Sequence, residues 1–250
     1  MLTRSFCCFR GLSVEAEAML WRRGCLSWRH LGIEARRVLS PAKSASVIEQ
    51  LPLFKTALEA RSADFFVGRL PAGHRLRIFP AFVQDAAFLD IETTGLSRQA
   101  VVTVISVLQN GKMQTFVRGR NLHDFIQVWQ GMRVVLTFNG ACFDLPFLMR
   151  EFGFSCKPAH IDLKHEAKCW GLRGGLKEIE SRLGYRRTDI ESGDGEKAVE
   201  LWETYEMTGD AIHLQKLIAY NTCDVRSLEL LAKRIWKLSC QNYPAPHPAS

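Results

Sequence analysis

The spacing of apolar positions changes near residue 76, and the two parts of the chain predict different structures. Up to that point apolar residues recur at helical intervals, so residues 13–39 are expected to form two short helices. Ser13 and Ser27 are suited to begin these helices, and Gly24 is suited to follow the end of the first. The N-terminal part is therefore predicted to be helical.

The helical pattern continues after Pro41 and ends by Pro71. Proline lacks the amide hydrogen that a helix interior needs, so we expect Pro52 to lie near a helix start. Residues 1–75 are thus predicted to form a helical N-terminal region. Its segment FRGLSVEAEAMLWRRGCLSWRHL resembles a helix-hairpin-helix element, although the turn reads GLS in place of GIG.

From about residue 76 the chain is rich in β-branched and aromatic residues, which is typical of strands. Asn110 and Gly111 carry a strong hairpin turn signal between two of the expected strands. The later chain is mainly helical, and we expect its last helix, over residues 211–238, to break or bend near Tyr220. The expected strands are RLRIFPAF, AAFLDIE, VVTVISVLQ, KMQTFVRG and MRVVLTFN, and the other expected helices cover residues 144–153, 175–184 and 195–208. This order predicts an α/β domain over residues 76–240, with residues 241–250 as a flexible tail.

Composition is that of a globular protein, with 47% hydrophobic and 24% charged residues among 250. The formal charge of +7 and the pI near 9.1 suit a polyanionic partner. Eight cysteines form no CxxC pair, so we expect reduced thiols in a cytosolic protein. The group His160, His165 and Cys169 lacks a second ligand pair for zinc and is better explained as a surface strand and helix.

No apolar run approaches the roughly 18 residues that a membrane helix needs. The start, MLTRSFCCFRGL, has no apolar core of signal-peptide length. Arginines up to Arg37 would suit a mitochondrial presequence, but Glu15, Glu17 and Glu34 interrupt it. We therefore expect a cytoplasmic protein.

The segment FLDIETTGL, residues 88–96, carries the first candidate chemistry. Asp90 and Glu92 are two residues apart on a strand, so both side chains point to the same face. Adjacent carboxylates on a buried strand repel each other unless a cation lies between them. Oxygen ligands favour magnesium or manganese over zinc.

Two later segments add candidate residues. TFNGACFDLPFL places Asn139 at a strand end and Asp144 at a helix start, where the helix dipole stabilises an anion. AYNTCDV places Tyr220 and Asp224 four residues apart, on one face of a helix. Each of these residues alone also has an ordinary structural explanation.

Together the motifs DIET, NGACFD and YNTCD resemble the exonuclease motifs of the DEDD (DnaQ-like) superfamily, in the subclass with a tyrosine ahead of the last aspartate. Over residues 76–237 the chain resembles the YprB-type ribonuclease H-like family through FLDIETTGL, TFNGACFDLPFL, HIDL, GGLKEIESRLGYRR and YNTCDV, in that order. The resemblance implies a ribonuclease H-like mixed sheet flanked by helices. It also implies a metal-dependent nuclease acting as a 3′→5′ exonuclease on nucleic acid, DNA or RNA, with single-stranded ends.

The resemblance further implies a two-metal mechanism with Mg²⁺ or Mn²⁺. Asp90 would bridge both ions, Glu92 and Asp224 would complete one site, and Asp144 would hold the second, with the ions about 3.5 to 4 Å apart. An ordinary tyrosine pKa of about 10 makes Tyr220 a poor base, so orientation of the attacking water is the expected role. Related sequences often carry histidine at that position, which leaves the proton acceptor open.

The resemblance implies that Thr93, Thr94, Gly95 and Leu96 hold the terminal nucleotide, although a strand ending in a turn explains them equally well. Asn139 either contacts the sugar or phosphate or caps the helix near Asp144. Asp162 in HIDL is expected to cap the next helix and stays outside the metal set. Lys177 is expected to bind phosphate, together with Gly174 and Gly175 at a helix start and with Arg173, Arg186 and Arg187, although a solvated helix face explains each of these charges as well.

Two other functions fit the same residues. The chain could be a nucleic-acid-binding module that has lost catalysis, or an endonuclease on the same fold. The motifs do not distinguish DNA from RNA, because reading of the 2′-hydroxyl depends on pocket geometry.

Overall fold

The computed structural model describes residues 2–155, 157–187 and 195–241. The chain divides into two compact units, one built from residues 1–83 and 234–250 and the other from residues 84–233. Within the described residues, none of the helices has the length and apolar content that crossing a bilayer requires.

The N-terminal unit is helical and has an aromatic core. Phe9 stacks on Phe54 with ring centroids 4.0 Å apart, and the edge of Trp28 packs against both rings. Ser13 caps its helix as predicted, because its hydroxyl accepts a hydrogen bond from the amide of Ala16. The elements are η1 (Leu2–Arg4), α1 (Val14–Arg22), α2 (Trp28–Val38), α3 (Pro41–Glu59), α4 (Ala63–Val67), η2 (Arg75–Ile78) and α5 (Phe79–Phe82).

Three expectations for this region are wrong. Pro52 lies inside α3, at an exposed position, and not near the start of the helix. RLRIFPAF forms η2 and α5 instead of a strand, because Pro80 in the first turn of α5 suits a helix start better than a ladder. The GLS turn, which ends at Ser13, is not flanked by two α-helices, since η1 and turns precede it.

The second unit contains a five-stranded sheet in the order β3-β2-β1-β4-β5. The first three strands in the chain are antiparallel neighbours, whereas β1, β4 and β5 are parallel. Asn110 and Gly111 make the predicted hairpin turn, with φ angles of 51° and 73°. The strands are β1 (Ala86–Thr93), β2 (Val102–Gln109), β3 (Lys112–Val117), β4 (Val134–Thr137) and β5 (Ala159–Asp162).

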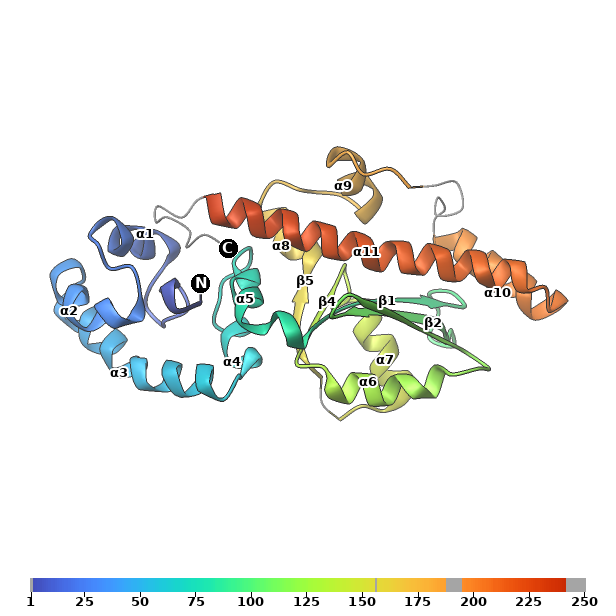
Figure 1. The fold of residues 1–250 in the computed structure, drawn as a ribbon, viewed down its shortest axis with the longest axis horizontal. Helices are drawn as coiled ribbons and strands as arrows, with labels where there is room; N and C mark the ends of the chain where they lie inside the picture. Colours follow the sequence, from blue (N-terminus) through green and yellow to red (C-terminus); the bar gives the residue numbers. More distant parts are fainter. Residues whose placement is uncertain (1, 156, 188–194, 242–250) are drawn as a thin grey trace. The chain divides into compact units, whose positions relative to one another are not determined.

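Helices cover both faces of this sheet (Figure 1), which confirms the predicted α/β class. On one face, Leu89 and Ile105 pack in one apolar cluster with Trp129 of α6 and Leu148 of α7. On the other, Val104 belongs to a cluster contributed by α10 and α11. The helical elements lying wholly or mostly in this unit are η3 (Val83–Asp85), η4 (Leu122–Asp124), α6 (Phe125–Gly131), α7 (Asp144–Phe152), α8 (Leu163–Cys169), α9 (Leu176–Arg182), α10 (Gly195–Thr208) and α11 (Ala211–Gln241), whose residues from 234 onward belong to the first unit.

Helix α11 runs without interruption through Tyr220, so the predicted break is wrong. The segment contains neither proline nor glycine, and its apolar side chains keep a helical period against the sheet. An unbroken helix carries Tyr220 and Asp224 at fixed spacing along one face.

Candidate metal centre

Strand β1 directs Asp90 and Glu92 toward α11. Its alternate residues, including Leu89 and Ile91, point into the opposite apolar cluster, so the two acids share the other face. There they meet Asp224 of α11, and ligand oxygens of the three carboxylates all lie within 4.8 Å of one another. The structure thus brings together three of the four predicted metal ligands.

Burial in this cluster raises the pKa values of Asp90 and Glu92 well above their ordinary range. Loss of solvent is the largest cause, and repulsion from Asp224 is the next. The pKa of Asp224 is also raised by burial, although Arg187 opposes the shift. Repulsion among buried carboxylates is the condition that favours a bound cation.

Asp144 is the first residue of α7, as predicted, and only 2% of it is exposed. Burial raises its pKa to about 7, against the lowering effect of the backbone amides of Asp144 and Ile91. It lies outside the three-carboxylate group but close enough for its charge to raise the pKa of Asp90. Asp144 therefore borders the cluster and could supply a ligand at its edge.

Asn221 is a residue that the sequence interpretation missed. Its side-chain amide donates a hydrogen bond to Asp90 Oδ2 at 2.7 Å and lies 3.5 Å from Glu92 Oε1. It is three residues before Asp224 on α11, so helical spacing gave a signal that it shares the acidic face. Asn221 fixes the two strand carboxylates relative to α11.

Arg187 is buried against the same cluster. Its guanidinium donates to Asp224 Oδ1 at 2.5 Å and to Glu180 Oε1 at 2.6 Å. Burial by itself lowers the pKa of Arg187, but the bonds and charges of Glu180 and Asp224 outweigh it and raise that pKa. The alternative that Arg187 lies on a solvated helix face is therefore wrong, and phosphate binding by this residue stays a prediction.

Tyr220 lies beside the acidic group and is 9% exposed. Its hydroxyl accepts a hydrogen bond from Lys177 Nζ at 3.1 Å, and the same ammonium lies 4.7 Å from the ring centroid. Burial, followed by the charge of Asp224, raises the pKa of the phenol. A phenol that stays protonated can donate a hydrogen bond but cannot accept a proton at neutral pH.

The turn after β1 holds the residues expected to contact a nucleotide. The Thr93 hydroxyl donates to the carbonyl of Gly95 at 2.7 Å, and Gly95 has a φ of 140°, which favours glycine. The Thr94 hydroxyl accepts from the amide of Val101 at 3.0 Å. Leu96 is 84% exposed, so its side chain is available to a ligand.

Asp162 has the capping role that was expected of it. Its carboxylate accepts hydrogen bonds from the amides of Lys164, Asn139 and Ala141 at 3.0, 2.9 and 3.2 Å. Asn139 has a φ of 65°, and its side-chain oxygen accepts from Lys164 Nζ at 3.2 Å. Asn139 does not cap α7, whose N-cap is Phe143.

The amide of Gly175, one of the two glycines before α9, is not free as expected. The amide of Gly175 donates to Glu178 Oε2 at 2.7 Å within the same helix start. A phosphate would have to displace this carboxylate. Lys177, directed at Tyr220, is the residue of this segment that reaches the acidic group.

The donor set fits a hard divalent cation. All four candidate ligands are carboxylates, which suit magnesium or manganese. Among the described residues, Asp144 Oδ1 and Asn221 Oδ1 are buried oxygens without a hydrogen-bond partner. Buried unpaired oxygens are costly, and coordination or hydration of a cation would satisfy them.

The chain is similar to known proteins in two comparisons. Residues 87–236 match the family RNase_H_2, described as RNase_H superfamily. No curated protein matches the chain. Among solved structures the chain is similar to the family B DNA polymerase from the hyperthermophilic archaeon Pyrobaculum calidifontis, at 19% identity and a TM-score of 0.49, over 60% of this chain. The chain spans about a quarter of that polymerase, 24% of its length.

A mixed sheet with helices on both faces and acids on its central strand defines a ribonuclease H-like, nuclease-type fold. The family match covers more than half of the chain, so the chain belongs to the RNase_H superfamily. Nucleases of this superfamily generally use divalent metals and act on nucleic acid, and the acidic group of β1 and α11 is compatible with both.

Proposed function

We propose that this protein is a Mg²⁺- or Mn²⁺-dependent nuclease that hydrolyses phosphodiester bonds as a 3′→5′ exonuclease of the DEDD type. The observation that carries the proposal is the convergence of Asp90, Glu92 and Asp224 within 4.8 Å in a site that burial makes unfavourable for unneutralised charge. Exonuclease direction is supported by the motif resemblance.

Asp90, Glu92, Asp224 and Asp144 would hold two divalent ions. Bound there, the ions supply a water of lowered pKa and stabilise negative charge on the leaving oxygen. Asn221 keeps Asp90 in position through its 2.7 Å hydrogen bond. The carboxylates hold the site in place, and the chemistry depends on their remaining ionised.

The neighbouring residues bind and orient the substrate. Tyr220 orients the attacking water through its hydroxyl, while Lys177 approaches both this phenol and the substrate phosphate. On the other side, the turn from Thr93 to Leu96 receives the terminal nucleotide, with the exposed Leu96 against a base. Asn139 contacts the sugar or phosphate at the end of β4.

The test is a cleavage assay on DNA and RNA oligonucleotides labelled at one end, with Mn²⁺. We expect the wild type to give a ladder shortened from the 3′ end, and Asp90→Asn or Asp224→Asn to give no cleavage above background. Glu203→Gln, an exposed acid of α10, is the matched control and should cleave like the wild type. Asp90→Asn is the cleaner variant because Asp224 also pairs with Arg187.

The alternatives have separate outcomes in the same assay. Cleavage of a circular single strand would show an endonuclease. Binding of the labelled oligonucleotides in Mn²⁺ without cleavage of any of them would show a nucleic-acid-binding module. Cleavage that survives both aspartate changes would overturn the assignment of the site.

A further inference from the structure

The positive charge of the chain is concentrated in its N-terminal part. Residues 1–83 contain 13 Lys and Arg against 6 Asp and Glu, a formal charge of +7. Residues 84–250 contain 20 of each and are formally neutral. The whole excess of positive charge therefore lies outside the region that matches the superfamily, in a unit with its own aromatic core.

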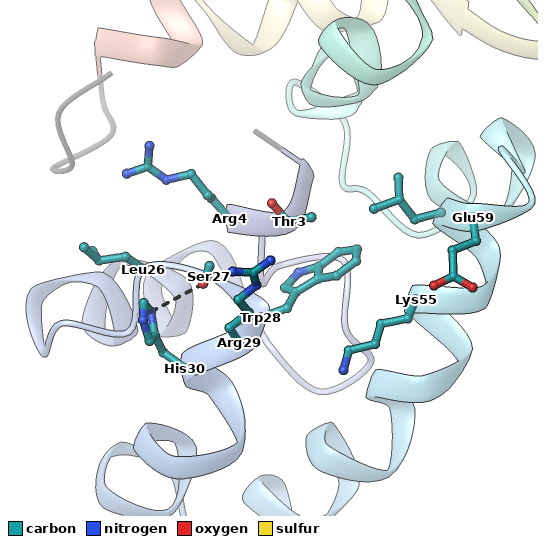
Figure 2. Close-up of a pocket in the computed structure, with 10 residues that line it drawn as sticks. Thr3, Arg4, Leu26, Ser27, Trp28, Arg29, His30, Lys55 and Glu59 are labelled. Atoms are coloured by element: carbon teal, nitrogen blue, oxygen red, sulfur yellow. Dashed lines mark hydrogen bonds between the residues drawn. The ribbon is translucent and has the colours of Figure 1, made fainter. Parts of the chain in front are cut away.

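A groove of about 600 Å³ opens on this unit beside η1, the start of α2 and the later part of α3 (Figure 2). Its charged lining is basic except for Glu59. Arg29 and His30 reach it from α2, Lys55 from α3 and Arg4 from η1. The indole of Trp28 lies between Arg29 and Lys55 in this view.

Two of the cations at this groove, Arg29 and Lys55, are available to a ligand. Among the described residues, neither Arg29 nor Lys55 makes an ion pair, and both side chains are exposed. Arg77 of the same unit shows the contrast, since it is buried and paired with Glu17 at 2.6 Å. Unpaired cations that face one groove from two helices are suited to an anionic ligand.

The aromatic side chain at this groove is not placed to stack on bases. Trp28 is only 4% exposed, and its indole N–H donates to the carbonyl of Ser5 at 2.8 Å, so its ring face is not free to stack on a base. Lysine and arginine bind phosphate oxygens without sequence preference. The chemistry of the groove therefore matches a sugar–phosphate backbone.

We propose that this groove is a second nucleic-acid contact that binds the phosphate backbone of a substrate strand through Arg29 and Lys55. The identity of the polyanion rests on the proposed nuclease function. Binding here adds affinity that depends on salt and not on sequence. It requires neither the metal nor the acidic group of β1 and α11.

The test measures binding of the full chain to fluorescein-labelled DNA and RNA 20-mers by anisotropy, in EDTA so that no cleavage occurs. The double change Arg29→Glu with Lys55→Glu is compared with Arg23→Glu with Lys43→Glu, two exposed cations of the same unit outside the groove. Both double variants change the net charge by the same amount. Thermal melts check that each variant is folded.

We expect the groove variant to bind DNA and RNA about tenfold more weakly than the wild type, and the control variant to lose much less affinity. For two phosphate contacts on a single strand, the slope of log affinity against log salt should fall by about 1.4 in the groove variant alone. An equal loss in both variants would assign binding to diffuse surface charge, and no loss in the groove variant would exclude the groove. Loss of heparin binding with unchanged DNA and RNA binding would assign the groove to another polyanion.

The proposal and the nuclease function fail in different experiments. Anisotropy in EDTA reports binding whether or not the chain cleaves. The Mn²⁺ cleavage assay with Asp90→Asn reports chemistry whether or not the groove binds. A chain that cleaves but whose groove variant binds normally would overturn only the proposal for the groove.

Discussion

Arg187 places a buried positive charge directly against Asp224. The guanidinium also holds Glu180, so one cation serves two carboxylates with little solvent around any of them. A divalent ion that takes Asp224 as a ligand must compete with this arginine for the carboxylate. If the acidic group holds metal as proposed, Arg187 would tune its affinity for the ion.

We expect Arg187→Gln to lower the stability of the metal-free protein, because it leaves two buried carboxylates without their counter-charge. Removing one member of a buried pair typically costs about 3 to 5 kcal/mol. The same change should tighten Mn²⁺ binding, since the internal competitor is gone. Urea unfolding in EDTA and calorimetric titration measure the two effects.

Arg186→Gln is the matched control, because Arg186 is the exposed neighbour. It should change neither quantity. Unchanged metal-free stability in Arg187→Gln would contradict the role assigned to the ion pair.

His74 makes the helical unit sensitive to acid. Burial, followed by the charge of Arg77, lowers its pKa to about 4, whereas an unfolded histidine has a pKa of about 6.5. The unfolded chain therefore binds this proton more readily. The stability contributed by neutral His74 is fully present above about pH 6.5 and is lost as the pH falls toward 4.

Between pH 6.5 and pH 4, we expect the free energy of unfolding to fall less in His74→Gln than in the wild type. The difference between the two losses should be at most about 3 kcal/mol. Urea unfolding at a series of pH values measures the difference. His123→Gln, which alters an exposed histidine, should follow the wild type. Parallel curves for His74→Gln and the wild type would contradict the burial argument.

At the scale of elements, sequence patterns predicted the features that depend on neighbouring residues, such as strand alternation and turns. Alternation along β1 fixed which face Asp90 and Glu92 share, and the Asn110-Gly111 signal fixed the hairpin. RLRIFPAF was mistaken for a strand because its buried residues are compatible with either a strand or a helix. The ion pair of Arg77 with Glu17 favours the helical conformation of η2. Tertiary contacts override propensity in such short segments.

The parts of the candidate site that depend on nearby residues in the sequence could be predicted, and the parts that depend on distant residues could not. The motif residues could be read from spacing on a strand and a helix. The Arg187–Asp224 pair joins residues 37 positions apart and depends on how the segment after α9 packs, which no periodicity records. The contact of Lys177 with Tyr220 is non-local for the same reason.

Glu17 of α1 joins three parts of the helical unit. Its carboxylate accepts hydrogen bonds from the amides of Phe6 and Cys7 and pairs with Arg77 of η2, with no exposed surface. We expect Glu17→Gln to destabilise the unit by roughly 3 to 5 kcal/mol, since Arg77 stays buried without its partner charge. Urea unfolding followed by circular dichroism measures this loss.

Glu15→Gln changes an exposed acid two residues away on the same helix and serves as the control. It should stay within about 0.5 kcal/mol of the wild type. Equal stability of the two variants would show that the buried pair does not hold the N-terminal segment to α1 and η2.

At the scale of the whole molecule, the two kinds of charge are separated along the chain. Residues 1–83 carry the formal excess of +7, while the sheet unit buries a group of acids. The positive charge of residues 1–83 attracts a polyanion. The buried acids of the sheet unit repel a polyanion unless cations neutralise them. Under the proposed function, metal would have to bind before nucleic acid at the acidic group, whereas the proposed contact at the groove in the helical unit would need no metal.

The same reasoning predicts that divalent metal stabilises the folded chain. The fold brings buried Asp90, Glu92 and Asp224 together, and a bound cation would relieve the repulsion among them. The unfolded chain has no such group, so the ion is expected to bind the native state in preference to the unfolded one. A ligand at 100 times its Kd then adds about 2.7 kcal/mol. We expect Mn²⁺ to raise the Tm of the wild type and of Glu203→Gln in thermal melts, with a smaller rise in Asp90→Asn. Because Asp90→Asn also removes repulsion, its metal-free Tm should equal or exceed that of the wild type. A metal-induced rise of the same size in Asp90→Asn would mean that the cation binds elsewhere.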